Sequence, residues 1–173
     1  MNRKKTIHLL IDILVISLLV LFDNYTKELA VKKLKDSEPF PIIGKIFELR
    51  YLENRGAAFG MFQNRQIVFI IVSIVFLCFI AYVLYKVPLT KRYAIFEATL
   101  TILASGAIGN MIDRATQNYV VDFFYFRLIN FPIFNVADIY VSVSCVVLGI
   151  ILIFVFKEND FEFLSIRNKQ NNE

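Results

Sequence analysis

The sequence predicts an all-α membrane protein with four transmembrane helices and a small β-containing platform between the first and the second helix. The composition is the first reason, because 57% of the 173 residues are hydrophobic and the mean hydropathy is +0.59. Soluble domains rarely reach such values. The second reason is that the chain contains four separate apolar segments, each close to the roughly 17–25 residues that a spanning helix needs.

The four predicted spans form one domain, residues 1–166, and leave a disordered tail at 167–173. The first span lacks the small-residue cleavage site of a secretory signal peptide, so we expect it to be retained. Both termini then share one side of the membrane, and the two longer loops share the other. The spans cover residues 6–22, 67–85, 93–112 and 139–156.

The platform is predicted over residues 23–66. Phe47–Tyr51 alternates apolar and charged residues, as a half-exposed strand does. A turn is expected at Asn54-Arg55-Gly56. The stretch 57–62 that follows is small and apolar, and we expect it to lie at the membrane interface.

Charge favours a membrane surface as the partner of this chain. The net charge of +4 is modest, and the basic residues lie between apolar runs, which suits lipid better than nucleic acid. Basic clusters beside the spans favour a cytoplasmic terminal side. The long loop is nearly as basic, so charge alone leaves the orientation open.

The single histidine, His8, excludes several kinds of active site. A His-Glu-x-x-His metalloprotease site cannot be built from one histidine, and because His8 lies at the start of the first span, no Ser-His-Asp triad can be built near the polar loops. The two cysteines form no zinc pattern. We therefore expect neither a metal nor a cofactor.

Asp122 and Asp138 are the candidate catalytic residues. Each lies at the edge of an apolar run in the second loop, and carboxylates beside hydrocarbon are costly and usually functional. If the chain reversal at Pro132 brings them together, the pair holds one proton and can activate water. The alternatives are structural: Asp138 suits a helix N-cap, and Asp122 suits a solvated loop.

The end of the third span supplies further polar groups. Asp113 and Arg114 fit a structural ion pair or an interfacial anchor, whereas Asn110 lies inside a helix end and needs partners. Close helix packing is sufficient to explain the small residues 104–109. Asp12 and Glu97 lie nearer the terminal side and are expected to be snorkelling or hydrogen-bonded.

Five blocks along the chain resemble, in order, those of the lipoprotein signal peptidases, the type II signal peptidases of bacteria. Any one block is weak, but five in order in a four-span chain are highly specific. Ser105 and Asn24 depart mildly from the family pattern. The blocks are Asp23-Asn24-Tyr25-Thr26-Lys27, Asn54-Arg55-Gly56-Ala57-Ala58-Phe59, Gly106–Arg114, Val120-Val121-Asp122-Phe123 and Phe134-Asn135-Val136-Ala137-Asp138.

The resemblance implies an aspartyl endopeptidase at the outer face of the bacterial cytoplasmic membrane, with cytoplasmic termini and an extracytoplasmic platform. Its substrates would be prolipoproteins with a lipobox, cleaved before a cysteine that carries diacylglyceryl, and we expect a monomer. The catalytic pair maps onto Asp122 and Asp138. The supporting or substrate-binding positions are Asp23, Lys27, Asn54, Gly56, Asn110, Asp113, Arg114, Asn135 and Ala137.

Two other classes of protein compete with the peptidase hypothesis. A small ion- or proton-coupled carrier could use Asp122 and Asp138 as relay sites, although both acids lie on one face and no broken helix crosses the membrane. A non-catalytic assembly or chaperone subunit would not need both carboxylates. We further expect Phe59 and Phe62 to cover the site and exclude water.

Overall fold

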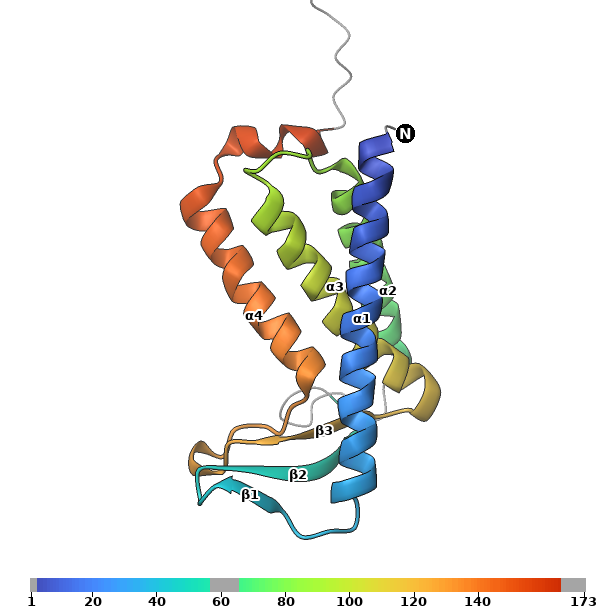
Figure 1. Cartoon of the computed structure of the whole chain (residues 1–173), viewed down its shortest axis with the longest axis vertical. Coiled ribbons are helices and arrows are strands. Elements are labelled where there is room, and N and C mark those ends of the chain that lie inside the picture. Colours follow the sequence, from blue (N-terminus) through green and yellow to red (C-terminus); the bar gives the residue numbers. More distant parts are fainter. Residues whose placement is uncertain (1–2, 57–65, 166–173) are drawn as a thin grey trace, which may run out of the picture.

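The computed structural model describes residues 3–56 and 66–165 and contains the expected four long apolar helices. They are α1 (Arg3–Leu34), α2 (Gln66–Lys86), α3 (Ala94–Gln117) and α4 (Val136–Ile150), the last continued by the π-helical turn η3 (Ile151–Val155). Each is long and apolar enough to cross a membrane. The chain is therefore a multi-pass membrane protein, and its helices form a bundle with a sheet at one end (Figure 1).

The sheet has three antiparallel strands in the order β1-β2-β3. The hairpin of β1 (Phe40–Ile43) and β2 (Phe47–Asn54) comes from the loop between the first two helices, which confirms the predicted strand. β3 (Val120–Tyr125) comes from the connection between α3 and α4, where the 3-10 turn η2 (Arg127–Ile129) follows it. Asp122 thus lies on a paired strand and not in a solvated loop.

α1 continues well beyond the predicted span 6–22, so the non-helical part of the platform begins near residue 35 and not at 23. The apolar run ends at Phe22, but the helix persists because Lys27 and Ala30 are buried against the rest of the protein. Its 32 residues give a length of about 48 Å, against roughly 30 Å of hydrocarbon. α3 likewise continues past residue 112 to Gln117.

α3 is the central helix of the bundle. More than half of its apolar window (56%) is buried inside the protein, against 11–17% for the other three helices, and it contacts all of them. A core of Ile80, Val83, Phe96 and Leu100 packs α2 on α3. The other helices expose large apolar side chains, as helices facing lipid do.

Polar contacts also stabilise the end of the bundle opposite the sheet, where α1 begins. The Thr101 hydroxyl donates to Asp12 (3.0 Å), as expected for a hydrogen-bonded acid within a span. The C-terminal 3-10 segment η4 (Glu158–Leu164) crosses this end, opposite the sheet (Figure 1). There Arg92 donates twice to Asp160, at 2.6 Å each. The predicted interfacial stretch 57–62, with Phe59 and Phe62, and the tail 167–173 lie outside the described residues.

Candidate active site

β3 and the start of α4 bring the two candidate aspartates into one hydrogen-bonded network. The backbone bridge between Phe124 and Phe134 closes the reversal that the sequence suggested at Pro132. Asp122 lies in β3 and is 1% exposed, whereas Asp138 lies in the first turn of α4 and is half-buried. The resulting site has one carboxyl held away from water and one that water can reach.

Two amide side chains connect the carboxyls. Asn135 Nδ2 donates to Asp122 Oδ1 (2.7 Å) and to Asn110 Oδ1 (3.2 Å). Asn110 Nδ2 in turn donates to Asp138 Oδ1 (2.8 Å). Because amides carry no net charge, they fix the positions of both carboxyls without neutralising either.

The N-cap of α4 is Asn135, so the prediction that Asp138 fills this position is wrong. The Asn135 side chain accepts from the Asp138 backbone N–H (2.9 Å), and Asp138 Oδ2 accepts from the Asn135 N–H (3.1 Å). This reciprocal capping box starts the helix at Val136, before the predicted start at 139. Asp138 therefore lies in the first turn of α4.

Asn54 supplies a further hydrogen bond to Asp122. Its Nδ2 donates to Asp122 Oδ2 at 2.8 Å, while its own Oδ1 accepts from the Gly56 N–H at 3.0 Å. The predicted turn after β2 thus orients an amide toward the carboxyl. Both oxygens of Asp122 consequently accept from an amide, so its side chain is fixed in position.

The pKa of Asp122 is raised from an ordinary 3.8 to about 7. Burial is the main cause, because it disfavours the charged form, and the nearby charge of Asp138 raises the pKa further. Hydrogen bonds from Asn54 and Asn135 act in the opposite direction and limit the rise. Near neutral pH the buried carboxyl therefore retains a proton that it can give away.

Lys27 is the buried cation that ties α1 to this network. It is 3% exposed, and its Nζ reaches Asp23 Oδ2 (2.8 Å), Asp113 Oδ2 (2.9 Å) and Asn110 Oδ1 (3.1 Å). Asp23 also accepts from the Ala137 N–H at 2.9 Å. α1 thereby positions both Asn110 and the start of α4, and Asp113 pairs with Lys27 and not with its neighbour in sequence.

Arg114 lies on another side of the network. Its guanidinium covers the ring of Phe69 in α2, 4.9 Å from the centroid, and its Nη1 donates to the Asn110 carbonyl (3.2 Å). The catalytic and supporting positions that the sequence selected are therefore joined in one set of contacts. Phe69 was missed, because an aromatic residue inside an apolar run carries no distinguishing signal.

Two glycines of the small-residue run in α3 allow the close approach that the site needs. A Cβ on Gly106 would lie 2.5 Å from the carbonyl oxygen of Ala137, and one on Gly109 would lie 2.6 Å from Asp23 Oδ2. The prediction of close helix packing in this run is confirmed. Gly109 also has a functional consequence, since it leaves room for the carboxylate that binds Lys27.

Gly109→Ala is expected to destabilise the protein by about 1–3 kcal/mol, because the added methyl must displace Asp23. Gly149→Ala is the matched control, since, among the described residues and apart from its own helix backbone, no atom lies within 4 Å of its Cβ position. In a helix that change is expected to be neutral or stabilising by about 0.5–1 kcal/mol. Thermal unfolding midpoints in detergent compare the two; equal midpoints would contradict the close contact at Gly109.

Within residues 3–56 and 66–165, no group of three or more His, Cys, Asp or Glu side chains could hold a metal ion. The acids of the network are instead occupied by amides, backbone N–H groups and Lys27. Asp122 and Asp138 present two carboxyls, of which the buried one has a raised pKa and the other can be reached by water. This set of groups is suited to general acid–base hydrolysis by paired carboxyls.

Comparisons with known proteins agree with this arrangement. The Peptidase_A8 family model, described as signal peptidase (SPase) II, matches residues 15–155. The lipoprotein signal peptidase of Caldanaerobacter subterraneus subsp. tengcongensis is 41% identical over 143 residues, which are 82% of this chain and 95% of that protein. The lipoprotein signal peptidase of Clostridioides difficile is 43% identical over 143 residues, 82% of this chain and 94% of its own length.

The fold has a solved counterpart as well. A bacterial membrane enzyme structure obtained by the in meso method at 2.3 Å resolution superimposes with a TM-score of 0.73 and 28% identity, over 93% of this chain and 94% of that one. The family match includes every residue of the network described above. The chain therefore belongs to the signal peptidase II family, the A8 family of aspartic peptidases.

Proposed function

We propose that Asp122 and Asp138 are the catalytic pair with which this chain, a lipoprotein signal peptidase, cleaves signal peptides from prolipoproteins. One observation carries the proposal: two carboxyls share a network of amides, and burial and mutual charge hold the pKa of Asp122 near 7. Such a pair retains one proton across a wide pH range. It therefore contains a general acid and a general base at the same time.

The proposed mechanism starts with Asp122 protonated and Asp138 ionised. Asp138 takes a proton from water, whose oxygen attacks the scissile carbonyl carbon, while the Asp122 O–H donates a hydrogen bond to the developing oxyanion. When the tetrahedral intermediate collapses, the C–N bond breaks and the nitrogen takes up a proton from the pair. The pair then returns to its singly protonated state.

We expect cleavage to decline as pH rises through about 7. A carboxyl whose pKa is raised to about 7 is protonated below that pH and loses its proton above it, which removes the general acid. Asn54→Leu removes a hydrogen bond that lowers this pKa, so the decline is expected to move to higher pH. The profile of kcat/KM against pH measures both effects; an unchanged profile in Asn54→Leu would contradict the role assigned to this amide.

The finer features of the substrate follow from where the network lies. It lies at the sheet end of α3 and α4, where both helices leave the apolar part of the bundle (Figure 1). A peptide bond next to a diacylglyceryl-modified cysteine would be held at this depth by its lipid, which raises its effective concentration. We therefore propose prolipoproteins with a lipobox, cut before the lipidated cysteine.

The orientation that we propose has cytoplasmic termini and a site at the outer face of the bacterial cytoplasmic membrane. Basic residues adjoin the spans at the terminal end, which supports this orientation. They are Arg3, Lys4, Lys5, Lys86, Lys91 and Arg92. Every residue of the network comes from one chain, which supports a monomeric enzyme.

The experiment that tests the substrate class compares two forms of one prolipoprotein, with and without diacylglyceryl on the lipobox cysteine. The purified protein is assayed in detergent with EDTA. We expect cleavage immediately before the cysteine, faster by about a hundredfold or more for the lipidated form, because only that form is anchored at the site. Equal rates for the two forms would remove the lipid from recognition, and no cleavage of either form would overturn the proposed function.

A further inference from the structure

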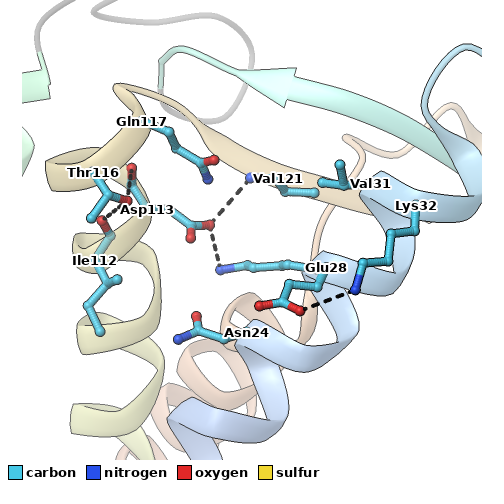
Figure 2. Close-up of a pocket in the computed structure, with 10 residues that line it drawn as sticks. Asn24, Glu28, Val31, Lys32, Ile112, Asp113, Thr116, Gln117 and Val121 are labelled. Atoms are coloured by element: carbon cyan, nitrogen blue, oxygen red, sulfur yellow. Dashed lines mark hydrogen bonds and ion pairs between the residues drawn. The ribbon is translucent and has the colours of Figure 1, made fainter.

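A cavity of about 290 Å³ lies between α1 and α3, where both helices extend beyond the apolar spans (Figure 2). Its walls include Val121 of β3 but neither of the proposed catalytic aspartates. Neighbouring residues of a strand point to opposite faces of the sheet, so Val121 and Asp122 face away from each other. β3 therefore separates this cavity from the catalytic pair.

We propose that this cavity binds the headgroup of a phospholipid that carries hydroxyl groups and one phosphate, of the phosphatidylglycerol type. Lys27 and Asp113 of its lining also belong to the network around the catalytic pair, but neither Asp122 nor Asp138 lines the cavity, so the lipid site can be tested separately from the catalytic proposal. Its position is the first argument. Leu21 and Phe22 on α1 are large, apolar and 63% and 54% exposed, and the cavity begins with Asn24 about 3 Å further along the helix axis. A lipid whose chains pack beside them has its headgroup at the cavity.

The second argument is a set of polar groups that have no partner in the described part of the chain. The amides of Asn24 and Gln117 make no hydrogen bond there, and neither does Oδ1 of Asp113, although that residue is only 7% exposed. Figure 2 shows these three side chains turned toward the space between the helices. Amides next to a carboxylate acceptor suit hydroxyl groups, which both donate and accept.

The third argument is charge. Lys32 lies at the rim, with its Nζ 3.7 Å from Glu28 Oε2 and both side chains 69% exposed. Such a long, exposed ion pair contributes little, so Lys32 can turn to a phosphate. Lys27 is already occupied by Asp23 and Asp113. One available cation at the rim therefore fits a headgroup with one phosphate.

The size of the cavity agrees with this ligand. Its volume of about 290 Å³ is many times what a single water molecule needs, so it leaves room for a glycerol joined to a phosphate. A choline headgroup offers a phosphate but no hydroxyl for Asp113, so the cavity is expected to discriminate between the two lipids.

The test is native mass spectrometry of the full chain, incubated with phosphatidylglycerol or phosphatidylcholine of identical acyl chains. We expect roughly tenfold greater retention of phosphatidylglycerol, and loss of most of this preference in Gln117→Leu and in Lys32→Ala. Lys33→Ala is the matched control, because Lys33 is exposed on the same helix but does not line the cavity. It should keep the preference.

Equal retention of the two lipids would overturn the proposal. An equal loss of the lipid preference in Lys33→Ala and Lys32→Ala would overturn it too, because the preference would then arise from general surface charge and not from the cavity. Glycerol 3-phosphate is added as a soluble competitor. If it binds as tightly as the lipid, the ligand is a free phosphate ester and not a membrane component. Cleavage is followed in parallel, and activity retained without lipid preference would reject this site while leaving the catalytic pair intact.

Discussion

Asp122→Asn and Asp138→Asn are each expected to lower kcat by about a thousandfold or more. Either change removes one member of the proposed catalytic pair, in which one carboxyl would donate a proton and the other accept it. The measurement is cleavage of a lipidated prolipoprotein by purified protein in detergent with EDTA. Asp36→Asn is the control, because Asp36 is exposed and its backbone is left-handed (φ 58°), a conformation that asparagine tolerates.

Unfolding curves separate a catalytic loss from misfolding in these variants. The pKa of Asp122 is higher in the folded protein than its ordinary 3.8. Between about pH 4 and pH 7 the folded protein therefore keeps a proton that the unfolded chain has lost, so the free energy of unfolding falls as pH rises. The stability of the wild type relative to Asp122→Asn should therefore fall over this range and level off above it. Turnover that persists in a folded variant would exclude that aspartate from the mechanism.

Lys27→Met is expected to destabilise the protein by about 3–5 kcal/mol, the largest effect on stability that the structure predicts. The change leaves Asp23 and Asp113, which are 0% and 7% exposed, without their shared cation. A buried carboxylate without a partner is costly. Denaturant unfolding in micelles compares this variant with Lys33→Met, an exposed position on the same helix that should change little.

A double variant tests whether the loss arises from the orphaned charge. Lys27→Met combined with Asp23→Asn should recover part of the stability, because one of the two uncompensated carboxylates is gone. If the double variant is simply the sum of the two single changes, the three side chains do not act as a unit. That result would contradict the coupling between α1 and the catalytic network.

Much of the fold could be predicted because the lengths of apolar runs, and the alternation of apolar and charged residues in one strand, report it directly. The four apolar runs gave the helices, and alternation at Phe47–Tyr51 gave a strand. Helix ends were harder, since hydropathy marks where the membrane ends and not where the helix does. α1 continues to Leu34 through polar residues because Asp23 and Lys27 find partners on α3 and α4, and such partners cannot be read from one segment of sequence.

The candidate site could also be predicted in part from hydropathy. The error was again at a helix end, where the wrong residue was assigned as the N-cap of α4. Polar residues beside hydrocarbon identified Asn110 and the two aspartates, but not which group caps α4. Asn135 followed by an acid three residues later is a capping-box pattern, so this signal was present in the sequence and was assigned to the wrong residue. The close approach of Gly109 to Asp23 required the three-dimensional arrangement of two helices.

The C-terminal segment η4 has a practical consequence for handling the protein. It crosses the end of the bundle opposite the sheet, held there by Arg92 and Asp160 (Figure 1). A fluorescent reporter or a surface linker attached at the exposed Asn159 of η4 is thus joined to a part of the fold remote from Asp122 and Asp138. Immobilisation through that end would leave the sheet end of the bundle accessible to peptide substrates, which makes η4 a suitable attachment point for binding assays on a surface.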